Sequence, residues 1–87
     1  LVHQTDVGPL ASQGYFVGPA IFADVPENAG IAQEEIFGPV LSVLRAKDVD
    51  DAIRIANGTK YALTGGVFSR SPTHLDQVKR RFRVGNL

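Results

Sequence analysis

The 87-residue sequence contains no cysteine, no methionine and no tryptophan. Without cysteine these residues can form no disulfide and no zinc–thiolate site, and they offer no thiol for covalent catalysis. The missing methionine, together with a start at Leu1, leaves two interpretations open: a processed terminus, or a piece of a longer protein. Long hydrophobic runs are also lacking, because Val40–Leu44 and Tyr61–Phe68 are far too short to span a bilayer.

Neither sign of charge is in excess, because nine basic and nine acidic residues cancel. No net field attracts nucleic acid or an anionic membrane, so we expect neither as a partner. No basic segment precedes an apolar run at the N-terminus, so no signal peptide is predicted. A hydrophobic fraction of 44% and a charged fraction of 21% are ordinary for a soluble protein, and the length allows one domain at most.

The first half of the sequence contains two segments rich in β-favouring residues. Tyr15–Val25 predicts an extended segment that is interrupted at Gly18-Pro19, and Pro26–Gly30 predicts a turn-rich connection. The mostly apolar run Pro39–Ala46 is typical of a strand that is covered on both faces. The first fourteen residues have no clear periodicity and predict no element.

The second half predicts two amphipathic helices. The first begins after Asp48, a good N-cap, and ends at Asn57-Gly58. The second begins at Ser71-Pro72, a hydroxyl cap followed by proline, and ends before Gly85. Their apolar stripes are Val49, Ala52, Ile53 and Ala56 in the first helix, and Leu75, Val78 and Phe82 in the second. Acidic residues in the first turn of the first helix (Asp50, Asp51) and basic residues in the last turns of the second suit the helix dipoles.

Tyr61–Ser69 predicts a turn that leads into a third strand, and Val84–Leu87 resembles a strand that has only begun. The order strand, strand, helix, strand, helix predicts the α/β class with a largely parallel core. A natural domain rarely ends at the first residues of a core strand, because the unmade ladder leaves backbone groups unpaired. We therefore expect residues 1–87 to be an incomplete part of one domain.

The segment Glu34-Glu35-Ile36-Phe37-Gly38-Pro39 is the strongest candidate for chemistry. Two adjacent acids are most simply a solvated loop. However, one ionised carboxylate can accept two hydrogen bonds from the vicinal hydroxyls of a ribose. The ring of Phe37 offers a flat apolar surface for a heterocycle, and Gly38 allows close backbone approach.

Three other features carry less weight. Gly65-Gly66 could hold a phosphate, but a tight turn or close packing is the simpler interpretation. His3 and His74 have no partner at metal-ligand spacing, so no metal site is predicted. The basic run Lys79–Arg83 is more simply a solvated helix end than a phosphate site.

Several motifs together resemble the aldehyde dehydrogenase superfamily. Gln33–Val40 is similar to the signature segment of that superfamily, and the order of the surrounding motifs also matches. These motifs are Gly14-Tyr15-Phe16 with Pro19, Asp51-Ala52-Ile53 through Ala56-Asn57, and Tyr61-Ala62-Leu63. Leu63–Arg70 and Phe82–Leu87 resemble the Δ1-pyrroline-5-carboxylate dehydrogenase branch, which oxidises glutamate γ-semialdehyde to glutamate in proline breakdown. Ala20 and Ala62 depart from residues common in the family and affect only local detail.

The resemblance implies NAD as the cofactor of the parent enzyme. Glu35 would hold the nicotinamide ribose and Phe37 would pack near the nicotinamide, whereas Glu34 would remain a loop acid. The nucleophilic cysteine and the general-base glutamate of the family lie upstream, so no catalytic residue is assigned here and the isolated chain is expected to be inactive.

The partners implied are the remainder of the parent enzyme, a small-molecule aldehyde and further copies in a homo-oligomer. The location implied is the cytoplasm, or the mitochondrial matrix in a eukaryote. One alternative from another class stays open: a standalone α/β module that binds a small molecule or a partner and performs no chemistry.

Overall fold

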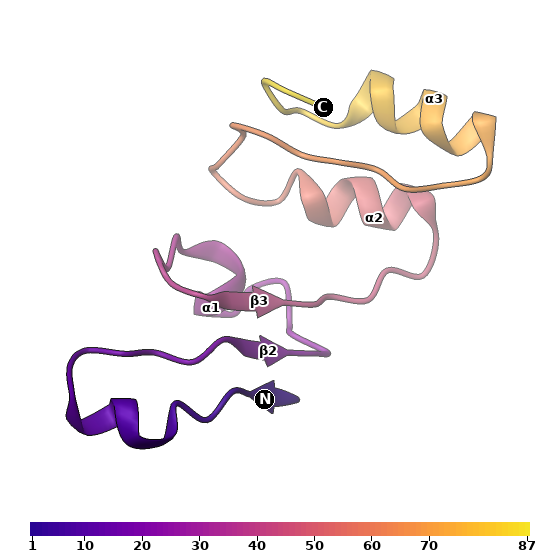
Figure 1. Cartoon of the computed structure of the whole chain (residues 1–87). Coiled ribbons are helices and arrows are strands. Elements are labelled where there is room, and N and C mark those ends of the chain that lie inside the picture. Colours follow the sequence, from indigo (N-terminus) through magenta and orange to yellow (C-terminus); the bar gives the residue numbers. More distant parts are fainter. The chain divides into compact units, whose positions relative to one another are not determined.

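The computed structural model describes all 87 residues, and the contacts divide the chain into two compact units, Leu1–Arg45 and Ala46–Leu87. Figure 1 shows the elements in sequence order, with the strands in the first unit and the two longer helices in the second. The α/β class expected from the sequence is confirmed. No helix combines the length and the apolar character that crossing a bilayer would require.

The first unit is built on a three-stranded sheet in the order β1-β2-β3. β1 (His3–Gln4) pairs antiparallel with β2 (Ala20–Phe22), and β2 pairs in parallel with β3 (Val40–Ser42). Parallel neighbours require a crossover, and the connection from β2 to β3 contains the one-turn helix α1 (Gly30–Gln33). The parallel pairing at the centre of the expected fold is therefore present, between β2 and β3.

The first fourteen residues contain two elements that the sequence did not predict. They are β1 and the 3₁₀ helix η1 (Gly8–Ser12). Both are too short to establish a hydrophobic period, and all of their residues are exposed. Just before η1, the carboxylate of Asp6 accepts a hydrogen bond from the backbone N–H of Gly8 at 2.8 Å, and Val7 occupies the N-cap position. Local polar bonding, rather than burial, specifies this segment.

The break predicted at Gly18-Pro19 has a steric cause. The N–H of Thr5 donates to the carbonyl of Pro19 at 2.8 Å, which brings the two chains together just beyond β1. A Cβ on residue 18 would lie 1.9 Å from the carbonyl oxygen of Thr5. Only glycine permits this approach, so the sheet ladder itself dictates Gly18.

The expectation that Pro39–Ala46 forms a strand covered on both faces is wrong for the residues described. β3 occupies only three positions of that run, and Leu41 and Val43 are 55% and 41% exposed. The apolar pattern correctly indicated a strand. It could not reveal that the face of the strand with Leu41 and Val43 stays exposed, whereas Val40 and Ser42 are half-buried.

In the second unit, α2 (Val49–Ala56) begins as predicted. The Asp48 carboxylate accepts a hydrogen bond from the Asp51 N–H at 2.8 Å. Asp51 in turn pairs with Arg54 at 2.8 Å and accepts from the Lys47 N–H at 3.2 Å. The hydrogen bond from Arg54, followed by that from Lys47, lowers the pKa of Asp51 below its ordinary value.

The second helix, α3 (Pro72–Arg81), also begins at its predicted cap, with the Ser71 hydroxyl accepting from the His74 N–H at 3.3 Å. α2 and α3 contact one another, and each stripe contributes one of the two buried hydrophobic residues of this unit, Ile53 and Val78. The rest of the predicted stripes is only partly covered: Leu75 is 38% exposed.

A side-chain amide adds a polar connection between the helices. The Asn57 Nδ2 donates to the carbonyl of Arg81 at 2.9 Å, and its Oδ1 accepts from the N–H of Arg83 at 2.8 Å. We call this pair of bonds the Asn57 clamp. It joins the C-terminus of α2 to the last residue of α3 and to the segment that follows it. From the sequence, Asn57 was expected only to end its helix.

The strand expected within Tyr61–Ser69 is largely absent, and this prediction is wrong beyond its first residues. Thr64 and Asn86 form an isolated parallel bridge. Two further backbone hydrogen bonds extend the bridge slightly. The N–H of Gly85 donates to the carbonyl of Ala62 at 2.8 Å, and the N–H of Asn86 donates to the carbonyl of Leu63 at 3.1 Å. The strand start expected at Val84–Leu87 is thus paired, but over too few residues to form a ladder.

Gly65 is a second position where only glycine fits. Its N–H donates to the carbonyl of Asn86 at 2.9 Å, and a Cβ there would lie 2.2 Å from Cε1 of the Phe82 ring. The neighbouring Gly66 has no atom within 4 Å of such a Cβ. Close packing, the simpler interpretation of Gly65-Gly66, accounts for the first glycine.

We predict that Gly65→Ala lowers the free energy of unfolding by about 1–3 kcal/mol, because the methyl group must displace the Phe82 ring. Gly66→Ala is the matched control and should change stability by less than about 0.5 kcal/mol, since its Cβ meets open space. Urea unfolding followed by far-UV circular dichroism measures both. Equal losses for the two variants would contradict the packing role of Gly65.

The capping network of α2 predicts a pH dependence. A carboxyl group whose pKa is lowered in the folded state stabilises the fold above its ordinary pKa, near 3.8 for Asp51, and loses that effect as pH falls through the lower folded value. The difference in melting temperature between the unmodified chain and Asp51→Asn should therefore shrink below about pH 4. Thermal melts from neutral to acidic pH test this, and a difference independent of pH would contradict it.

Candidate functional site

The candidate residues Glu35 and Phe37 lie on the loop Glu34–Pro39, which joins α1 to β3. Its first end is held by α1. The amide of Gln33 donates to the carbonyl of Glu27 at 2.6 Å, and the hydroxyl of Ser42 donates to the carbonyl of Ile31 at 3.2 Å. These bonds tie the single turn of α1 to the preceding turn and to β3.

The second end of the loop is held by the sheet. The N–H of Ala20 donates to the carbonyl of Pro39 at 2.9 Å, so the ladder between β2 and β3 starts at the last residue of the loop. The N–H of Val40 folds back onto the carbonyl of Gly38 at 2.8 Å. With both ends fixed, the residues between them form a short projection rather than a free segment.

Both carboxylates of the loop are exposed, and neither Glu34 nor Glu35 forms an ion pair within the chain. Each is therefore available to accept hydrogen bonds from a ligand. The two acids have the same burial, so the distinction between them rests on the sequence resemblance and stays a prediction.

Phe37 combines two features that are unfavourable for a folded chain. Its ring is 92% exposed, and its backbone is left-handed, with φ of 51°. The left-handed conformation brings Cβ close to the following carbonyl and disfavours every residue except glycine. Neighbouring Ile36 is also 44% exposed. Strained backbone positions often occur at ligand sites, so the exposed ring of Phe37 supports the hypothesis that this residue contacts a ligand.

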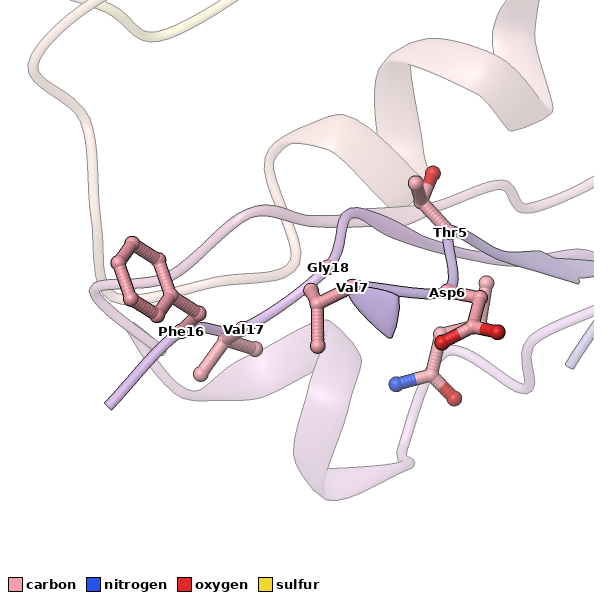
Figure 2. A pocket seen from close by; sticks show the side chains of 7 residues that line it. Thr5, Asp6, Val7, Phe16, Val17 and Gly18 are labelled. Atoms are coloured by element: carbon pink, nitrogen blue, oxygen red, sulfur yellow. The ribbon is translucent and has the colours of Figure 1, made fainter. Parts of the chain in front are cut away.

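A separate hollow of about 430 Å³ lies in the same unit. Figure 2 shows Phe16 and Val17 at one end of it and Thr5 and Asp6 at the other, with Gly18 between the two groups. It shares no residue with the loop Glu34–Pro39. Its one charged group, Asp6, already accepts a hydrogen bond from the Gly8 N–H, and neither Glu35 nor Phe37 lines it, so the hollow is not the predicted cofactor site.

The two histidines and the basic run lie as follows. His3 lies 3.4 Å from the hydroxyl of Thr5, and His74 is exposed in the first turn of α3. No three side chains of the metal-binding types gather anywhere in the chain. In the basic run, Arg80 pairs with Asp76 at 2.9 Å and Arg81 pairs with Asp50.

Comparison with known proteins places this geometry in context. The family model described as "Aldehyde dehydrogenase family" matches residues 2–87. A 1-pyrroline-5-carboxylate dehydrogenase of Geobacillus sp. (strain WCH70) is 54% identical over 76 residues, which are 87% of this chain and 15% of that protein.

Two solved structures are similar over most of the chain. One is 1-pyrroline-5-carboxylate dehydrogenase from Thermus with bound NAD, which is 59% identical with a TM-score of 0.84, over 86% of this chain and 14% of that one. The other is proline utilization A from Bdellovibrio bacteriovorus, which is 61% identical with a TM-score of 0.83, over 85% of this chain and 8% of that one. The chain spans about 15% of the length of the curated relatives it matches.

The strain at Phe37 yields a stability prediction. Phe37→Gly and Phe37→Ala both remove an exposed ring, but only glycine relieves the left-handed backbone, by about 1–2 kcal/mol. The greater freedom of glycine in the unfolded chain offsets about 0.5–1 kcal/mol of this gain. We expect the glycine variant to be the more stable of the two by about 0.5–1 kcal/mol in urea unfolding. An alanine variant of equal or greater stability would show that the loop relaxes without strain.

Proposed function

The chain belongs to the aldehyde dehydrogenase family, and we propose that it forms part of the catalytic domain of an NAD-dependent enzyme that oxidises glutamate γ-semialdehyde to glutamate. The observation that carries the proposal is the coincidence of two facts. The chain is 50–54% identical to the 1-pyrroline-5-carboxylate dehydrogenases of Bacillus subtilis and Geobacillus sp.. The segment that resembles the family signature is also the segment held at both ends and projecting between them.

The residues of the loop fit the chemistry of a nicotinamide nucleotide. An exposed carboxylate at Glu35 is a double acceptor and suits the two adjacent hydroxyls of a ribose. The accessible ring of Phe37 suits an apolar contact with a flat heterocycle. The related Thermus structure contains bound NAD, which supports NAD as the cofactor of the parent enzyme.

The role proposed for these residues is positioning. NAD supplies the hydride acceptor when it is bound. Glu35 would fix the ribose, and the anchors of the loop would fix Glu35, so that the position of the acceptor is set before the reaction. Such pre-arranged geometry contributes orders of magnitude to a rate. The chain contains no cysteine, so a nucleophilic thiolate would come from another part of the parent, and the isolated chain is proposed to be inactive.

Exposed apolar side chains support the proposal that this chain is covered by the remainder of a larger enzyme. Tyr15 and Phe68 are 107% and 102% exposed, and Leu63 is 84% exposed. The buried hydrophobic residues are few: Ala20, Val25, Ile53 and Val78. A standalone module of this size would bury too little apolar surface to stabilise a small domain. None of the relatives described above supports that alternative. We also propose, from the family, that the parent is a homo-oligomer.

Glu35→Gln in the parent enzyme tests the proposed role. The amide is close to the carboxylate in shape, but one of its ends becomes a donor, so charge-assisted bonds worth about 1.5–3 kcal/mol are lost. We expect weaker NAD binding or a lower kcat, by about 10- to 100-fold, with an unchanged melting temperature. Steady-state kinetics with NAD as the varied substrate provide the measurement.

Glu34→Gln is the matched control, because the neighbouring acid is also exposed and has no proposed contact. Its kinetic constants should stay within about twofold of the unmodified enzyme. If Glu35→Gln leaves both constants for NAD unchanged, Glu35 is only a loop acid. If Glu34→Gln has the larger effect, the two roles must be exchanged.

A further inference from the structure

We propose that Asn57 is a site of spontaneous deamidation, that the Asn57 clamp suppresses the reaction while it is closed, and that the product cannot restore the clamp. The inference concerns the second unit alone and is independent of the proposed function. It starts from the sequence Asn57-Gly58, because glycine leaves the following backbone nitrogen unusually free to attack an asparagine side chain.

The reaction needs only water. The Gly58 nitrogen loses its proton and attacks Cγ of Asn57, so that a new C–N bond closes a five-membered imide. The bond from Cγ to Nδ2 breaks, and the nitrogen leaves as ammonia. Water then opens the imide at either carbonyl, which gives aspartate or isoaspartate. The sum is hydrolysis of an amide to a carboxylic acid and ammonia, with no oxidant or reductant.

The folded geometry opposes this reaction at three atoms. Nδ2 and Oδ1 of Asn57 are both engaged in the clamp, at 2.9 and 2.8 Å. The attacking nitrogen is also engaged, since the Gly58 N–H donates to the carbonyl of Ile55 at 2.9 Å. Asn57 is helical, with φ −81° and ψ −5°. Ring closure requires the Gly58 nitrogen to eclipse Cβ about the Cα–C bond, and the helical backbone turns it away. Deamidation therefore requires the clamp to open first.

The product differs from asparagine in the group that the clamp depends on. A carboxylate at position 57 can still accept from the Arg83 N–H, but it has no proton to donate to the Arg81 carbonyl. It would instead place a negative oxygen against that carbonyl oxygen. Four exposed arginines line the adjacent hollow and attract the new charge weakly: Arg54, Arg80, Arg81 and Arg83. Isoaspartate also lengthens the backbone where α2 ends. Each opening thus risks a change that keeps the clamp open.

The chain contains its own reference sites. Its two other asparagines are followed by larger residues, in Asn28-Ala29 and Asn86-Leu87, whose side chains hinder attack by the next nitrogen. They experience the same buffer, temperature and time as Asn57. Preferential reaction of Asn57 when the chain is unfolded would therefore report the local sequence, and its suppression in the folded chain would report the clamp.

The test follows deamidation by mass spectrometry of the peptides that cover residues 1–87 in the folded parent enzyme, incubated at neutral pH and 37 °C on the order of weeks. A synthetic peptide covering residues 54–61 is incubated in parallel as the unprotected reference. Amide hydrogen exchange of the Arg83 N–H, measured on the same sample, reports whether the clamp is closed. We expect a protected Arg83 amide and a rate at Asn57 at least about tenfold below that of the peptide.

Two variants extend the test. Asn57→Asp reproduces one product and should abolish the protection of the Arg83 amide, while the amides of β2 in the other unit keep theirs. Gly58→Ala keeps Asn57 and should slow the reaction in the unfolded chain, because a Cβ shields the attacking nitrogen. The proposal is overturned if Asn57 deamidates as fast in the folded protein as in the peptide. It is also overturned if the Arg83 amide exchanges as fast as in the urea-unfolded protein, or if the Arg83 amide of Asn57→Asp stays as protected as in the unmodified protein.

Discussion

The pairing of β2 on both edges is the constraint on which the candidate site depends. β2 has only three residues, yet it holds β1 in antiparallel register and β3 in parallel register. Its first hydrogen bond, from Ala20 to the carbonyl of Pro39, fixes the end of the loop that carries Glu35 and Phe37. On the other edge the approach of Thr5 requires glycine at position 18. A shift of one residue in this register would turn every side chain of the strand to the opposite face and move the loop with it.

The features of the fold that could be predicted from the sequence are those specified by local chemistry. Asp48 and Ser71 cap their helices as expected, because a side-chain oxygen beside an unpaired N–H needs no distant partner. The signature segment, and with it the positions of Glu35 and Phe37 on one loop, could also be identified. What could not be predicted depends on contacts distant in sequence. The strand expected within Tyr61–Ser69 shrinks to a bridge at Thr64, and the covered strand Pro39–Ala46 has an exposed Leu41.

In the first unit, the conformation of the loop Glu34–Pro39 reduces the stability of the fold. An aromatic ring that is 92% exposed contributes little burial, and a left-handed backbone at Phe37 disfavours the folded loop. The buried hydrophobic residues of this unit are only Ala20 and Val25. The loop is therefore held mainly by the hydrogen bonds between β2 and β3 and by the side-chain hydrogen bonds of Gln33 and Ser42. The exposed ring and the left-handed backbone therefore both count against the stability of the loop within these residues.

The second unit also buries little apolar surface, and polar contacts between its two helices compensate for this. Ile53 and Val78 are its only buried hydrophobic residues, so apolar contact alone leaves the junction of α2 with α3 thin. The Asn57 amide compensates by satisfying a carbonyl and an N–H on the opposite segment with one side chain. Because one amide supplies both a donor and an acceptor, an aspartate at this position would keep only the bond from the Arg83 N–H, and the Arg81 carbonyl would lose its donor. A large apolar interface degrades gradually as single contacts are lost. This junction instead rests on few polar contacts, the Asn57 clamp and the ion pair of Asp50 with Arg81, so the loss of either weakens it.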